Sequence, residues 1–90
     1  MTRAVDATVT GRVQGVAFRH YTAEQARRLG VAGWVRNEPD ESVALHAEGP
    51  ADAVEALLDW CRTGPAMAKV ARVAVRDGAV TGATSFEVRY

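Results

Sequence analysis

Two short segments carry residue types suited to binding a phosphate and positioning a water molecule. The first runs from Gly11 to Arg19, and its two glycines, Gly11 and Gly15, permit backbone angles that other residues avoid. A turn of this kind that leads into a helix can direct several backbone N–H groups at one point, where the helix dipole adds positive potential. Arg19 stands at the junction, with a planar guanidinium that can grip a phosphate through two hydrogen bonds. On residue types alone, a plain turn with a surface arginine remains the simpler interpretation.

The second segment is Gly33 to Asn37. The Asn37 amide offers both a donor and an acceptor, so it could hold a water molecule by two hydrogen bonds. Asn37 and Arg36 are expected on opposite faces of a strand. On spacing alone, an asparagine that simply begins the turn before Pro39 is the favoured interpretation, and Trp34 is expected to be a packing residue.

The remaining chemically capable residues do not form a pattern. No carboxylate or cysteine accompanies His20 or His46 at metal-ligand spacing, so we expect no metal and no cofactor. We interpret both histidines as structural or exposed, and the dispersed acidic residues as solvated. Cys61 lies on an apolar helix stripe and is expected to be buried and inert.

Composition limits the possible functions further. The 90 residues predict one domain, and 11 basic residues balance 11 acidic ones, which argues against a nucleic-acid binder. A single cysteine excludes an intramolecular disulfide. The first residues lack the apolar run of a signal peptide, and no stretch approaches the roughly 20 apolar residues of a membrane span. We therefore expect a cytoplasmic protein without membrane contact. Separately, we expect it to be a monomer.

The elements that must hold these segments follow from periodicity. Alternating residues predict strands, and Val54, Leu57, Leu58 and Cys61 form a helical stripe. The expected elements are a strand at Val5–Gly11, a helix ending at Leu29, strands at Val31–Asn37 and Val43–Glu48, a helix between Pro50 and Gly64, and strands at Val70–Asp77 and Ser85–Tyr90. The order β-α-β-β-α-β plus a C-terminal strand predicts an α+β, ferredoxin-like two-layer sandwich, with a mainly antiparallel sheet and both helices on one face.

Both segments also match known signatures. The run Gly11-Arg12-Val13-Gln14-Gly15-Val16-Ala17-Phe18-Arg19 closely resembles the acylphosphatase signature, and Gly30-Val31-Ala32-Gly33-Trp34-Val35-Arg36-Asn37 resembles the family's second one. The ending Phe86–Tyr90 is similar to its C-terminal strand, so the resemblance covers essentially the whole chain. One departure is Glu41, in the turn after Asn37, where the family often has glycine.

The resemblance implies a metal-independent hydrolase that cleaves acyl phosphates to a carboxylate and inorganic phosphate. It implies that Arg19 and Asn37 are catalytic, with Asn37 holding the attacking water. Inorganic phosphate or sulfate should occupy the same site as the substrate's phosphate. The residues that the resemblance places around that phosphate are Gly15, Val16, Ala17, Phe18 and Arg19.

Two other functions are compatible with the predicted fold. Ferredoxin-like domains also serve as regulatory small-molecule modules, which have no need for the Arg19–Asn37 pair. RNA-recognition modules of this topology present aromatic residues on the central strands and a basic face. The aromatic residues here lie mostly outside the first and third strands, so RNA binding is the less favoured alternative.

Overall fold

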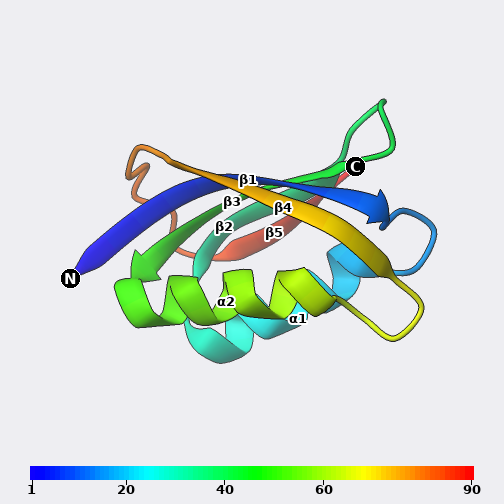
Figure 1. The fold of residues 1–90 in the computed structure, drawn as a ribbon. Coiled ribbons are helices and arrows are strands. Elements are labelled where there is room, and N and C mark those ends of the chain that lie inside the picture. The colour runs from blue at the N-terminus through cyan, green and yellow to red at the C-terminus, as the bar shows by residue number, and fades with distance from the viewer.

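The computed structural model describes residues 1–90 and shows two helices packed on one face of a five-stranded sheet (Figure 1). The strand order is β4-β1-β3-β2-β5, and only the β2–β5 pair is parallel. The elements are β1 (Thr2–Arg12), α1 (Phe18–Leu29), β2 (Ala32–Asn37), β3 (Val43–Pro50), α2 (Ala51–Thr63), β4 (Lys69–Asp77) and β5 (Phe86–Arg89). The fold class predicted from the sequence is confirmed.

The core lies between the sheet and the two helices. On α2, the predicted stripe of Val54, Leu57, Leu58 and Cys61 is fully buried, as its spacing indicates. On α1, the buried side chains include Phe18, whose ring lies 5.7 Å from that of Trp60 on α2. α1 covers β2 and β5, whereas α2 covers β4, β1 and β3. This arrangement places the first turn of α1 beside the end of β5.

Several strand boundaries differ from the predicted ones by one to three residues. β1 begins at Thr2, because Thr2 pairs with Pro50 and β3 therefore continues to that residue. Pro50 is consequently the N-cap of α2 and not its first helical residue. Gly11, the last residue of the predicted strand, lies in β1 at a bulge opposite β4, and the strand continues to Arg12. A Cβ atom on Gly11 would lie 2.3 Å from the carbonyl oxygen of Lys69, so close backbone approach accounts for this glycine.

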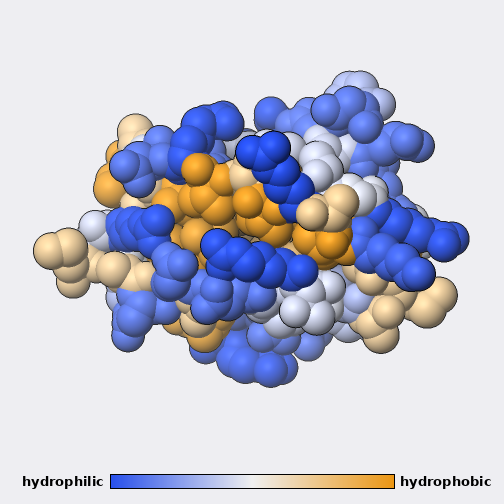
Figure 2. Space-filling model, in the orientation of Figure 1, coloured by the Kyte–Doolittle hydropathy of each residue, from blue (hydrophilic) through white to orange (hydrophobic).

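β4 forms one edge of the sheet. Figure 2 shows apolar surface along this strand, where it passes in front of the core, with hydrophilic side chains around it. Val73 is half-buried against the core, and Val75 is exposed. The bulge between Thr10 and Gly11 of β1 disturbs pairing at one end of β4, as is common at sheet edges. Neither helix of the protein is long and apolar enough to cross a membrane.

Candidate active site

The loop between β1 and α1 forms a cradle of unpaired backbone donors. Gly15 has φ 74° and Ala17 has φ 60°, so two left-handed residues alternate with ordinary ones just before the helix. A non-glycine residue in this conformation costs about 1–2 kcal/mol, and such strain concentrates at functional sites. The N–H groups of residues 15–20 donate to no backbone or side-chain acceptor, and no acidic side chain caps the first turn of α1. The cradle is therefore suited to an anion.

Arg19 lies beside the cradle and is held by β5. Its Nη1 donates to the carbonyl oxygen of Arg89 at 3.0 Å, and its Cζ lies 4.5 Å from the centre of the Tyr90 ring. None of the ion pairs in the structure includes Arg19. The guanidinium is thus oriented by neutral groups, and its charge is left for a bound anion.

Asn37 is the last residue of β2 and is half-buried. None of the side-chain hydrogen bonds in the structure includes the Asn37 amide, so both its donor and its acceptor are free. In the turn that follows, Glu41 has φ 73°, the left-handed conformation for which glycine would be the usual residue. Asp40 Oδ1 accepts hydrogen bonds from the backbone N–H and hydroxyl of Ser42 at 3.0 and 2.5 Å, and these bonds lower the pKa of Asp40. The turn is therefore formed without the glycine.

The cradle, Arg19 and Asn37 open onto one cleft of about 190 Å³. The residues that line it are Val13, Gly15, Ala17, Phe18, Arg19, His20, Asn37, Val88 and Tyr90. Val16 does not line the cleft, because its side chain packs against the core and borders a separate apolar groove with Trp60.

Four residues of the cleft were not predicted as site residues, and the first of them is Val13, at the start of the loop. His20 follows Arg19 on α1 and is exposed, and its ring lies edge-on to Tyr21 at 5.3 Å. Val88 and Tyr90 come from the chain end, and only the parallel pairing of β5 with β2 brings them to the cleft. No local pattern in the sequence reports that pairing.

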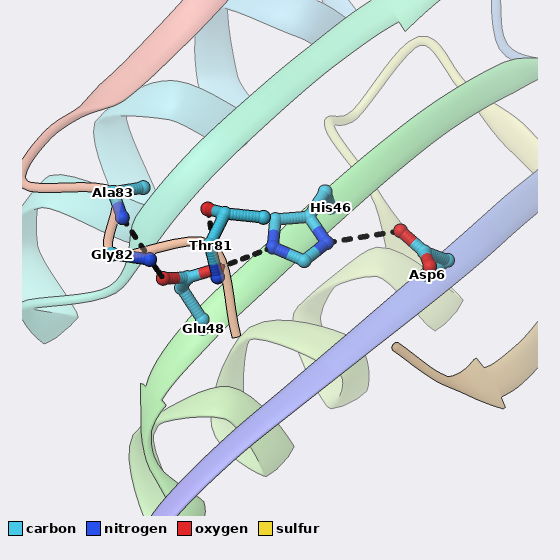
Figure 3. Close-up of polar contacts among 6 residues, drawn as sticks. All are labelled: Asp6, His46, Glu48, Thr81, Gly82 and Ala83. Atoms are coloured by element: carbon cyan, nitrogen blue, oxygen red, sulfur yellow. Dashed lines mark hydrogen bonds and ion pairs between the residues drawn. The ribbon is translucent and has the colours of Figure 1, made fainter. Parts of the chain in front are cut away.

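A buried cluster of charged side chains lies on the face of the sheet that carries no helices (Figure 3). The His46 ring is 5% exposed, with Nδ1 at 2.9 Å from Asp6 Oδ1 and Nε2 at 2.5 Å from Glu48 Oε2. Glu48 also accepts hydrogen bonds from the Thr81 hydroxyl and from three backbone N–H groups of residues 81–83. The expectation that every acidic residue is solvated was therefore wrong for Glu48, and His46 is structural.

The same contacts set the protonation of the cluster. Burial lowers the pKa of His46, but its two carboxylate partners outweigh burial, and the net effect raises the pKa. For Glu48, burial alone would raise the pKa, yet the hydrogen bonds from His46 and residues 81–83 lower it to about 2. Both ring nitrogens are taken by carboxylates, and no group of three His, Cys, Asp or Glu side chains is arranged to hold a metal ion.

A larger hollow of about 560 Å³ lies on this helix-free face, away from the cleft. Trp34 lines this hollow and stacks on His46, with the two ring centres 6.4 Å apart. The guanidinium carbons of Arg36 and Arg89 lie 4.7 and 5.0 Å from the centre of the Trp34 ring. The hollow is lined by acidic as well as basic residues, and no cradle of free donors opens into it. The geometry suited to phosphate therefore belongs to the smaller cleft.

The acylphosphatase family model matches residues 5–88, which include the cradle, Arg19 and Asn37. The chain belongs to the acylphosphatase family. It is therefore a hydrolase with acylphosphatase activity, as its resemblance to the two signatures implied.

Individual members of the family match over nearly their whole length. An acylphosphatase of a Nocardioides species is 61% identical, over 99% of this chain and 90% of its own. An acylphosphatase from Methylococcus capsulatus is 54% identical, over 89% of this chain and 87% of its own. The crystal structure of the Bacillus subtilis acylphosphatase covers 100% of both chains with a TM-score of 0.94 and 33% identity. The fold also occurs within larger proteins, since a full-length HypF structure matches at a TM-score of 0.89 and 22% identity over 12% of that chain.

Proposed function

We propose that the chain hydrolyses acyl phosphates with the phosphate held by Arg19 and the backbone N–H groups of residues 15–19, and with the attacking water held by Asn37. The observation that supports this is the convergence of unpaired N–H groups, an arginine free of acidic partners and a free amide on one cleft. Phosphoryl transfer depends mainly on positioning and charge stabilisation, which this set of groups supplies.

The reaction breaks the bond between phosphorus and the oxygen of the acyl carboxyl group. The water oxygen forms the new bond to phosphorus, and its two hydrogens stay on the inorganic phosphate or pass to solvent. The leaving group departs as a carboxylate that needs no proton. The cradle and Arg19 stabilise the charge on the phosphoryl oxygens as the bond lengthens. The chemistry requires no acid to protonate the leaving group, and we propose that it proceeds without a metal or cofactor.

We further propose that the protein acts as a cytoplasmic monomer on a small-molecule substrate. Cys61, its one cysteine, is buried in the core, and burial raises the pKa of its thiol to about 12, so the thiol is not available for an intermolecular disulfide. Inorganic phosphate and sulfate are expected to compete with the substrate for the cradle.

The test is phosphate release from benzoyl phosphate by the wild type and by Arg19→Ala. Loss of one preorganised donor costs about 10²–10³ in rate, and Arg19 carries a full charge, so Arg19→Ala should lose at least this much. Arg19→Lys should recover little, because an ammonium cannot replace the planar fork. Arg28→Ala, an exposed arginine on the same helix, is the matched control. Near-normal turnover by a folded Arg19→Ala protein would contradict the proposed role.

A further inference from the structure

Gln14 connects the cradle to the turn that follows Asn37. The residue stands between the buried Val13 and Gly15 of the cradle, and it is half-buried. Its side-chain Nε2 donates to two carbonyl oxygens, those of Glu38 and Ser42, each at 2.9 Å. An amide nitrogen has two hydrogens, so both are used by this one turn.

The two carbonyls lie at the two ends of the turn. Glu38 directly follows Asn37, and Ser42 directly precedes β3. Between them, Glu38 N–H donates to the Ser42 carbonyl at 2.9 Å, and Glu41 N–H donates to the Glu38 carbonyl at 3.1 Å. The bonds from Gln14 are the only hydrogen bonds that join residues 13–20 to residues 37–42. Apart from the pairing of the strands, Gln14 is thus the one side chain that joins the cradle to this turn by hydrogen bonds.

We infer that Gln14 is a positioning residue that sets the separation between the phosphate cradle and the Asn37 amide. This inference rests on the proposed function, in which the cradle holds the phosphate and Asn37 holds the water. In-line attack needs the reacting atoms roughly 3–3.5 Å apart, and a misplacement of about 1 Å can cost about 10²-fold in rate. Gln14 does not line the cleft, so its effect on the reaction should pass through Asn37.

The experiment is a double-mutant cycle between Gln14→Met and Asn37→Ala. Gln14→Met keeps the length of the side chain and removes both hydrogen bonds. We expect kcat on benzoyl phosphate to fall about 10- to 10²-fold, with the inhibition constant of inorganic phosphate unchanged within about twofold. In the Asn37→Ala background the same substitution should have almost no effect on kcat, because the group that Gln14 positions is gone. Gln25→Met, a half-buried glutamine of α1 with no side-chain hydrogen bond, is the matched control.

A second variant covers the case in which Gln14→Met fails to fold. Gln14→Glu has the same shape, and at neutral pH it faces the two carbonyls with a carboxylate, so it should lose at least as much turnover. Wild-type turnover in Gln14→Met, an equal loss in both backgrounds, or a parallel loss of phosphate binding would overturn the inference. An inactive wild type would instead contradict the proposed function. In that event, amide hydrogen exchange at Glu38 and Glu41 would test whether Gln14 holds the turn. Exchange as slow in Gln14→Met as in the wild type would show that it does not.

Discussion

The side chains of Arg19 and Asn37 line the same cleft, but only that of Arg19 is held in place by neighbouring groups. The Arg19 guanidinium is fixed by the Arg89 carbonyl and the Tyr90 ring, whereas the Asn37 amide has no partner. An oriented cation suits a group that binds phosphate in the ground state and in the transition state. A free amide suits a group that binds a water molecule present only when the site is loaded. The two residues are therefore expected to differ in their effects on binding and on turnover.

Substitutions of Asn37 separate water positioning from phosphate binding. Asn37→Ala should lower kcat steeply and leave the inhibition constant of inorganic phosphate nearly intact, since only a transition-state interaction is lost. Asn37→Asp adds a negative charge, and a unit charge about 4–5 Å from another is repelled by roughly 3–4 kcal/mol at an effective dielectric near 20. Asn37→Asp should therefore weaken phosphate binding as well. Steady-state kinetics and phosphate inhibition of both variants are the measurement, and an active Asn37→Asp enzyme would point to a general base instead.

At the scale of elements, the turn between β2 and β3 contains Glu41, a non-glycine residue in the left-handed backbone conformation. Glu41 adopts φ 73°, and the turn nevertheless closes through the hydrogen bonds of Asp40, Ser42 and Gln14. Glu41 therefore costs energy in this turn, which is closed by hydrogen bonds that do not involve its side chain.

Glu41→Gly should stabilise the protein. Relief of the left-handed strain is worth about 1 kcal/mol, partly offset by the greater entropy of glycine in the unfolded chain. The net gain should be a few tenths to about 1 kcal/mol in the free energy of unfolding, measured by urea denaturation. Glu87→Gly, in the extended strand β5, is the control and should destabilise, because glycine weakens a strand interior. A destabilised Glu41→Gly protein would show that the Glu41 side chain contributes to the turn.

The elements themselves were predictable wherever the signal is local. The stripe on α2 and the alternation in β1 and β3 report burial by spacing alone, so the order and class of the fold followed from them. The pairing of β5 with β2 joins segments that are far apart in the sequence, so spacing could not predict it. For the same reason, spacing could not predict that Val88 and Tyr90 line the cleft or that the Arg89 carbonyl binds Arg19. The roles of Arg19 and Asn37 came from resemblance to the family signatures, since spacing alone favoured an ordinary turn at both places. The burial of Glu48 could not be predicted from its neighbours in the sequence, because the groups that donate to it lie in the distant loop of residues 81–83.

At the scale of the whole molecule, the cluster of Asp6, His46 and Glu48 joins three parts of the chain. Asp6 comes from β1, His46 and Glu48 from β3, and Trp34 of β2 stacks on the imidazole. Glu48 holds the loop that leads from β4 towards β5 (Figure 3). The cluster therefore makes the stability of the fold dependent on the protonation of two buried groups.

The pH dependence of stability has opposite signs for the two groups. The pKa of His46 is raised in the folded state, so its contribution is complete below the ordinary value of 6.5 and is lost as pH rises through the raised value. The pKa of Glu48 is lowered from 4.5 to about 2, so its contribution is complete above 4.5 and is lost as pH falls towards 2. The contribution of the cluster should therefore be greatest between pH 4.5 and 6.5.

Urea denaturation of the wild type and of His46→Gln across this range is the measurement. The wild type should lose stability above pH 6.5, whereas His46→Gln should be less stable at pH 5.5 and should lack that decline. His20→Gln, at the exposed histidine, should follow the wild type. An unchanged decline in His46→Gln would assign the pH dependence to another group.

The hydrogen bond from Arg19 to the Arg89 carbonyl joins the first helix to the last strand. Ribosomes make proteins from the N-terminus, so a growing chain contains the cradle, Arg19 and Asn37 long before β5 exists. During that time Arg19 has neither the carbonyl nor the ring that orient it, and β2 has an open edge where β5 will pair. The cradle should thus be able to attract anions before the arginine is in place to use them. With the role proposed for Arg19, hydrolytic competence should follow the docking of β5, and activity should therefore report that docking.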